Sequence, residues 1–320
     1  MASPPHAGAA GARAGSEATT MRAVRQDRRP AMGGTAAITV VGGPPGLVDD
    51  CFALLDEVEQ AWSRFLDTSD VWRLNWAQGR PVQVRSCTVR LVRELIHAWA
   101  LTDGAFDPTT LPQLVAAGYA TSSTDPTRTT MLPDTATWPG SMTDIDIDGP
   151  LVRLSVGTTL DPGGLGKGLA SDMLTEFVLD RGADGVLVEV GGDLVVAGAA
   201  PDGGAWTIGI EDPFTGELLT VVRLTRGAVA TSSRLVRMWT GATGPAHHLI
   251  DPATGVSAVT STVTATVVAG SGARAEALTK LAFVREPEAL LGQVPRLGGA
   301  ALVLSADRRQ RRSVNWSDFE

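Results

Sequence analysis

The chain has 320 residues, of which 43% are hydrophobic and 19% are charged. This composition is typical of globular proteins and excludes a chain that is disordered throughout. The 27 Lys and Arg residues and the 35 Asp and Glu residues give a formal net charge of −8. Since no long basic run interrupts this balance, the sequence favours neither a nucleic-acid partner nor an anionic membrane.

The N-terminal segment, residues 1–30, is small, polar and mildly basic, and we expect a disordered leader with Met21 as a possible start. It lacks the apolar central run of a signal peptide. The chain contains no run of about 20 apolar residues, so no transmembrane helix is expected. The cysteines, Cys51 and Cys87, fit no zinc or disulfide pattern. Together these features predict a cytoplasmic protein.

The spacing of apolar residues predicts the elements of the fold. In chain order they are a strand over 35–41, helices over 47–65 and 88–101, a loop over 121–138, a hairpin over 144–156, a helix over 168–179, strands over 185–190, 194–197, 205–211, 219–225, 248–250 and 261–269, a helix over 273–284 and a strand over 300–305. Thr88 could cap the second helix, and the loop could mark a subdomain break near 121–140. Strands outnumber helices and hairpin-length gaps separate many of them. The pattern therefore predicts an α+β fold with mixed or mostly antiparallel sheets and packed helices.

A glycine-rich segment, DPGGLGKGLASD at 161–172, leads into the helix predicted over 168–179. Glycines before a helix let backbone N–H groups approach an anion, and Lys167 would add a positive charge. The spacing fits neither a Walker A loop nor a dinucleotide-binding GxGxxG motif. Spacing alone slightly favours an ordinary strand-to-helix turn over a phosphate contact.

Two further segments carry polar groups between or beside predicted strands. Gly191 and Gly192 indicate a bend, after which Asp193 could orient a ligand or close a turn. The adjacent His247 and His248 would point to opposite faces of a strand, so they cannot easily share a metal ion. One of them could act in proton transfer, although a structural role is the commoner one for a histidine pair.

The helix predicted over 273–284 carries Glu276, Thr279 and Lys280 on one face, by i, i+3 and i+4 spacing. The ordinary interpretation of a Glu and a Lys four residues apart, as Glu276 and Lys280 are, is a solvated surface ion pair.

The order of these segments resembles that of the FAD:protein FMN transferase family, also called ApbE. From about residue 31 to about 284 the chain contains, in the family's order, SRFLDTSDVWRLN, TDGAFDPTTLP, DPGGLGKGLASD, VEVGGDLVVAG, HHLIDPATG and AEALTKLAF. Each motif is weak alone, but six in series argue against chance.

The resemblance implies an ApbE-like domain over 31–320. Such a domain would bind FAD, use Mg²⁺ at the pyrophosphate and move FMN onto a Thr or Ser hydroxyl of an acceptor protein that carries a flavinylation motif, with release of AMP. Some relatives instead hydrolyse FAD or only hold it, so an FAD pyrophosphatase and a non-catalytic FAD-binding protein are the alternatives.

By position, the resemblance also implies roles for individual residues. It implies FAD contacts for Met32, Phe65, Ala105, Phe106, Asp107, Asp161, Lys167, Gly191, Gly192, Asp193 and Ile250, catalytic roles for His248 and Glu276, and Mg²⁺ contacts for the carbonyl of Gly164, for Glu276 and for Thr279.

The last motif departs from the family pattern, in which an Asp and a Thr four residues later are metal ligands. Glu276 and Lys280 occupy these two positions here. A glutamate can still bind a metal, whereas a protonated lysine cannot. Two possibilities follow: Thr279 supplies the missing ligand, or the ammonium group of Lys280 takes over part of the metal's charge.

Overall fold

The computed structural model of the protein describes residues 22–241 and 244–320. Most of the predicted leader therefore lies outside the described residues. Its predicted end at residue 30 is wrong, because β1 (Val24–Ala31) is an edge strand paired with β2 (Gly34–Gly42). The charged side chains of β1 hid this strand from a search for apolar alternation, and charges of this kind are common on edge strands.

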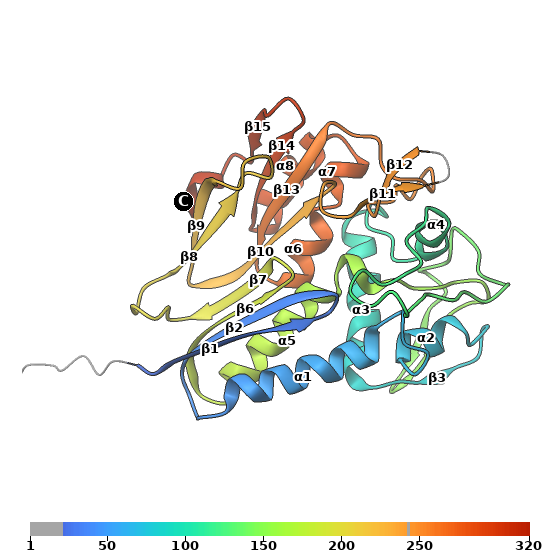
Figure 1. Cartoon of the computed structure of the whole chain (residues 1–320), viewed down its shortest axis with the longest axis horizontal. Coiled ribbons are helices and arrows are strands. Elements are labelled where there is room, and N and C mark those ends of the chain that lie inside the picture. Colours follow the sequence, from blue (N-terminus) through green and yellow to red (C-terminus); the bar gives the residue numbers. More distant parts are fainter. Residues whose placement is uncertain (1–21, 242–243) are drawn as a thin grey trace, which may run out of the picture.

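An eight-stranded sheet forms the centre of the molecule (Figure 1), and each strand is antiparallel to its neighbours. Its strands, in spatial order, are β1, β2, β6 (Ala183–Val190), β7 (Asp193–Gly198), β10 (Arg226–Ser233), β13 (Thr262–Ala269), β14 (Ala300–Ser305) and β15 (Gln310–Arg312). Three small sheets surround it: β3 (Val82–Gln83) with β5 (Leu151–Arg153) and β4 (Asp146–Asp148), β8 (Trp206–Glu211) with β9 (Leu218–Leu224), and β11 (Met238–Gly241) with β12 (Gly244–His247). The predicted α+β class with mostly antiparallel sheets is confirmed.

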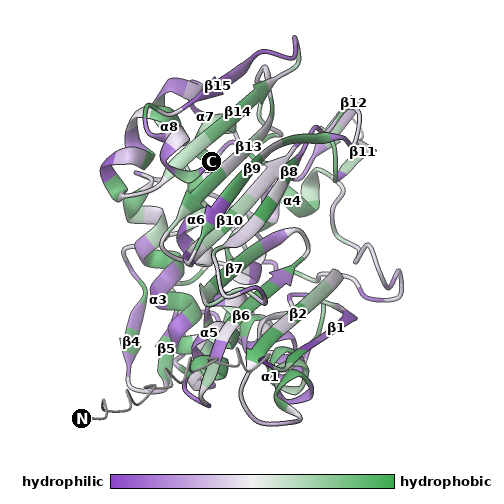
Figure 2. Ribbon diagram, turned by 90° about the vertical axis from the view of Figure 1, so that its left-hand side faces the viewer, coloured by the Kyte–Doolittle hydropathy of each residue, from purple (hydrophilic) through white to green (hydrophobic). Residues whose placement is uncertain are grey.

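Helices cover one face of the large sheet and the β8–β9 hairpin covers the other. The α-helices are α1 (Leu47–Trp62), α2 (Asp70–Asn75), α3 (Ser86–Leu101), α4 (Leu111–Ala116), α5 (Gly166–Leu179), α6 (Gly272–Leu278), α7 (Leu281–Val284) and α8 (Pro287–Gln293). Successive residues of β13 enter different hydrophobic clusters: Val267 packs on the helix side and Val268 on the hairpin side. Burial on both faces explains the continuous apolar run of this strand, and Figure 2 shows hydrophobic residues along the strands of the sheet.

Several local predictions need correction. Helix α3 begins at Ser86 with Arg85 as its N-cap, and Thr88 instead donates to the carboxylate of Asp70. The strand predicted over 248–250 is absent, since β12 ends at His247 and only an isolated bridge follows at Ile250. The helix predicted over 273–284 is divided between α6 and α7 at Thr279 and Lys280.

The segment 121–138 contains no helix or strand beyond a bridge between Thr121 and Thr129, as predicted for a loop. The subdomain break near 121–140 stays a prediction. None of the described helices is long and apolar enough to cross a membrane.

Candidate active site

A cleft of about 300 Å³ lies between three segments. These are the carboxyl end of β10, the glycine-rich turn before α5 and the loop that follows α1. The cleft collects most of the residues that the sequence singled out. Those that line it are Met32, Phe65, Ala105, Phe106, Asp107, Asp161, Gly164, Lys167, Gly191, Asp193, His248, Ile250 and Glu276. Gly192 and Thr279 do not line the cleft, because Gly192 lies on an exposed turn and Thr279 is fully buried behind it.

At the base of the cleft, Lys167 forms ion pairs with two carboxylates. Its Nζ contacts Asp193 Oδ2 and lies 2.8 Å from Glu276 Oε1. The second oxygen of each carboxylate accepts a backbone N–H: from Thr231 to Asp193 at 3.0 Å, and from Gly168 to Glu276 at 2.9 Å. All four carboxylate oxygens therefore have a donor, and Glu276, at 2% exposed, is not in a surface ion pair with Lys280.

The charges in this cluster depend on one another. Burial opposes the charged form of Lys167, but the carboxylates of Asp193 and Glu276 outweigh it and raise the lysine's pKa. Burial also favours a neutral Glu276, yet Lys167 and then Lys280 hold the pKa of that carboxyl below its usual value. Lys167 thus stays protonated at neutral pH, and its third N–H can reach a ligand in the cleft.

Close backbone contacts bring Glu276 to Lys167 across the chain. A Cβ on Gly168 would lie 2.3 Å from the carbonyl oxygen of Gly272, so the first turns of α5 and α6 approach each other only because both residues are glycine. The carboxylate of Asp172 accepts the N–H groups of Gly272 and Ala273 at 2.7 and 3.0 Å and fixes the start of α6.

The turn between β6 and β7 serves the same cluster. Gly191 has a φ of +61°, and a Cβ there would stand 3.1 Å from Cδ of Lys167. Glycine at this position avoids the strain of a left-handed backbone and leaves room for the side chain of Lys167. The turn also places Asp193 at the first position of β7.

A second lysine, Lys280, enters the cleft from the junction of α6 and α7. Its Nζ lies 2.9 Å from the carbonyl oxygen of Glu276 and 3.1 Å from Ser232 Oγ. The Thr279 hydroxyl donates to the same carbonyl at 2.7 Å and lies 2.6 Å from Ser232 Oγ. One set of directions satisfies this ring: Lys280 donates to Ser232, Ser232 to Thr279, and both Thr279 and Lys280 to the Glu276 carbonyl.

These contacts decide whether the residues fit the Mg²⁺ that the family resemblance implies. Magnesium requires several oxygen ligands around one point. The Glu276 carboxylate is directed to Lys167 and Gly168, the Thr279 hydroxyl is used in the ring, and the Lys280 stem lies beside Gly164. Among the described residues no group of three or more His, Cys, Asp and Glu side chains could hold a metal ion. The residues present do not fit a resident Mg²⁺.

His248 lines the cleft directly after β12, while its neighbour His247 turns inward and lies 3.1 Å from the carbonyl oxygen of Ala258 through Nε2. The Nδ1 atom of His248 is buried and makes no hydrogen bond to any described residue. Burial, followed by the nearby positive charges of Arg237 and Lys280, lowers the pKa of His248 to about 3. The imidazole is therefore neutral at physiological pH, and its enclosed Nδ1 has no partner among the described residues.

Several aromatic side chains also line the cleft, namely Trp62, Phe65, Phe106, Tyr119 and Phe283. Met32 and Gly33 form the two-residue turn of the β1–β2 hairpin, both with positive φ, and the Met32 N–H donates to Glu59 at 2.7 Å. Phe106 packs against Gly164, where a Cβ would come within 2.8 Å of its ring. A planar heterocycle could stack in this part of the cleft.

The remaining predicted ligands, Asp107 and Asp161, shape the backbone. Asp107 accepts from the N–H and hydroxyl of Thr109, both at 2.8 Å, and burial raises the pKa of its carboxyl despite these donors. Asp161 accepts the Gly163 N–H at 3.0 Å and so caps the turn over Pro162–Gly164.

Sequence reasoning missed several residues that line the cleft, among them Glu59, Arg64, Tyr119, Ser232 and Arg237. Arg64 is 5% exposed, lies over the rings of Phe65 and Tyr119 at 4.3 and 5.0 Å, and approaches Asp161 at 3.6 Å. For Arg64, the available signal in the sequence was its position beside the aromatic Phe65 in the segment SRF. Ser232 gave none, because β10 was not predicted.

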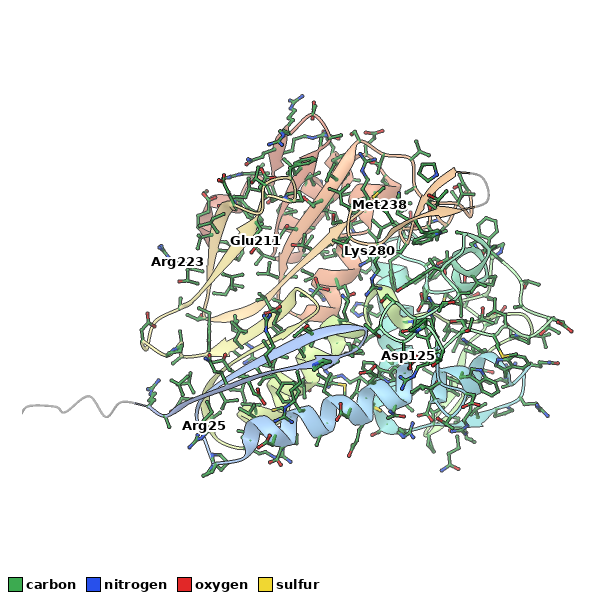
Figure 3. All side chains as sticks on the ribbon, in the orientation of Figure 1. Arg25, Asp125, Glu211, Arg223, Met238 and Lys280 are labelled. Atoms are coloured by element: carbon green, nitrogen blue, oxygen red, sulfur yellow. The ribbon has the colours of Figure 1, made fainter. Side chains whose placement is uncertain are left out.

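Lys280 lies near the centre of the molecule, between the strand-rich part and the loops that carry Asp125 (Figure 3). The fold and the cleft thus define an α+β protein with a deep polar and aromatic site whose cations suit a phosphate-containing ligand. The chain belongs to the ApbE family, whose model matches residues 32–303.

Known relatives agree with this assignment. The FAD:protein FMN transferase of Treponema pallidum is 29% identical over 301 residues, covering 85% of this chain and 80% of the relative. That of Vibrio cholerae is 28% identical over 268 residues, covering 78% of each chain. Among solved structures, the ApbE protein of Thermotoga maritima has a TM-score of 0.81 at 25% identity and covers 93% of this chain and 99% of that one. The flavinyl transferase ApbE of Pseudomonas stutzeri has a TM-score of 0.77 at 26% identity, covering 93% and 97%.

Proposed function

We propose that this protein transfers FMN from FAD to a Ser or Thr hydroxyl of an acceptor protein and releases AMP. One observation carries the proposal within this family: a single cleft is lined by two lysines, by a neutral histidine and by several aromatic side chains. In the proposed complex the lysines bind the diphosphate of FAD and the aromatic side chains contact its isoalloxazine ring. His248 lies near the phosphorus atom that is attacked.

The reaction forms one bond and breaks one. The acceptor oxygen attacks the phosphorus that carries the FMN portion, the bond from this phosphorus to the bridging oxygen breaks, and AMP leaves with that oxygen. The hydroxyl proton passes to His248, which is neutral and can accept it, and then to solvent. In-line attack on a diphosphate requires positioning and neutralisation of charge.

The electrostatics of the cleft connect substrate binding to the basicity of His248. Positive charge at Arg237 and Lys280 contributes to the low pKa of the imidazole. A bound diphosphate offsets these charges, so we expect the pKa of His248 to rise when FAD binds, which makes it a better base in the complex than in the free protein.

Lys167, Asp193 and Glu276 act as one unit in this proposal. Lys167 contacts the diphosphate, while the two carboxylates hold its ammonium group in place and Glu276 fixes the N–H of Gly168. Glu276 is therefore a positioning residue rather than the catalytic residue that the sequence suggested. No step is assigned to Mg²⁺, and the cytoplasmic location stays a prediction that cell fractionation would test.

Incubation of the protein with FAD and an acceptor domain that carries a Thr in the family's flavinylation motif tests the proposal. We expect AMP release only with the acceptor, together with flavin fluorescence on the denatured acceptor band. A Thr→Val acceptor serves as the matched control. Free FMN with AMP would indicate a pyrophosphatase instead, and intact bound FAD would indicate a non-catalytic FAD-binding protein.

A further inference from the structure

Lys280 is a half-buried cation in the cleft whose ammonium group makes no direct contact with any described carboxylate. Lys167 has two carboxylates and Arg64 has Asp161, whereas both oxygens that contact the Lys280 ammonium, from Ser232 and the Glu276 backbone, are neutral. The carboxylates of Glu276 and Asp193 act on Lys280 only through space. An anion in the cleft would therefore be the first charged group to contact this ammonium group directly.

The geometry of the ammonium group leaves one direction open. A lysine carries three N–H donors, and two of them are used by the Glu276 carbonyl and Ser232. Because Lys280 lines the cleft, the third can point to a ligand.

The lysine stem lies next to the glycine-rich turn. A Cβ on Gly164 would approach Cε of Lys280 to 3.3 Å, so the end of the side chain stands directly beside the backbone at which the family resemblance implies a metal. The hydrogen bonds of Glu276 and Thr279 leave no set of oxygen ligands there. The ammonium group of Lys280, which is attached to the chain, thus lies where the family resemblance implies a Mg²⁺ ion.

We propose that the ammonium group of Lys280 binds the diphosphate of FAD directly and replaces the divalent metal, so that FAD binding by this protein does not require Mg²⁺. The inference rests on the proposed function, because it takes FAD as the nucleotide in the cleft. It concerns binding, and the catalytic step can be tested separately from it.

Calorimetry with FAD and with riboflavin, in EDTA and in millimolar Mg²⁺, tests this inference. Riboflavin lacks phosphate, so it reports the flavin contacts alone. For the wild-type protein we expect the same Kd for FAD, within about threefold, in EDTA and in Mg²⁺. In EDTA, Lys280→Gln should weaken FAD binding about tenfold to a hundredfold, the usual range for loss of a charge-assisted hydrogen bond, and leave riboflavin binding unchanged.

Arg274→Gln is the matched control, since Arg274 lies on the neighbouring helix α6 and carries the same charge but does not line the cleft. It should bind FAD as the wild type does. The inference is overturned if wild-type FAD affinity falls tenfold or more in EDTA, a result that needs no variant, or if Lys280→Gln and Arg274→Gln bind FAD equally well. Failure of the protein to bind FAD under any condition would overturn the proposed function as well.

Discussion

Truncating Glu276 to alanine should destabilise the folded protein by about 3 kcal/mol. The side chain is almost fully buried and makes two contacts, an ion pair with Lys167 at 2.8 Å and a hydrogen bond from the Gly168 N–H at 2.9 Å. Removing one partner of a buried ion pair costs about 3–5 kcal/mol. Because Lys167 keeps Asp193 as a counter-charge, we place the loss at the lower end of this range.

Urea unfolding measures this loss, with equal m-values required for the comparison. Glu176→Ala is the matched control: Glu176 pairs with Arg90 at 2.6 Å, but the side chains are 53% and 38% exposed, so its removal should cost less than about 1 kcal/mol. Glu276→Gln retains an acceptor for Gly168 and should lose less than the alanine variant. If Glu276→Ala and Glu176→Ala are equally stable, the buried cluster does not exist as described.

Three further predictions concern the histidine and the glycine contact. His248→Ala should slow FMN transfer about 10²–10⁴-fold and leave FAD affinity unchanged, as single-turnover kinetics and calorimetry would show; an equal loss in both would make His248 a binding residue. The pKa of His248 is near 6.5 in the unfolded protein and about 3 in the folded protein. Above pH 6.5 the imidazole is therefore unprotonated in both states, and as the pH falls below 6.5 the unfolded state binds the proton first. Wild-type stability should therefore fall over this range by up to about 1.4 kcal/mol per pH unit, and His248→Gln should lose this part of the slope, whereas parallel pH profiles would contradict the assignment. Gly168→Ala should cost about 1–3 kcal/mol because its Cβ would meet the Gly272 carbonyl, while Gly292→Ala on α8, with open space around it, should be neutral or slightly stabilising; thermal unfolding that ranks them the other way would refute the contact between α5 and α6.

The sequence predicted the fold class because apolar periodicity marks buried strands and helices well. It missed β10, whose sequence RGAVATSS ends in small polar residues. Thr231, Ser232 and Ser233 line the cleft, where polar side chains are needed. Because these residues are polar, the strand lacks the apolar pattern by which strands were predicted. Strand β1 was missed for a different reason, since its edge position allows charges that break the apolar pattern.

Candidate site residues were found through the order of short motifs, whereas their interactions could not be read from the sequence. Lys167 and Glu276 are 109 residues apart, and only the crossing of α5 and α6 brings them together. Local spacing instead predicted an ion pair between Glu276 and Lys280, which is wrong because Glu276 turns its carboxylate toward α5. The partners of Lys280 depend likewise on Ser232 in a strand that was not predicted.

In the proposed reaction, FMN leaves FAD and becomes attached to an acceptor hydroxyl. Intact-mass analysis followed by peptide mapping of the acceptor, with AMP measured in the same sample, tests it most directly. We expect one FMN per acceptor in phosphoester linkage to the motif Thr, with one AMP released for each FMN attached. An acceptor that keeps its unmodified mass while FAD remains intact, or while free FMN accumulates, would contradict the proposed FMN transfer.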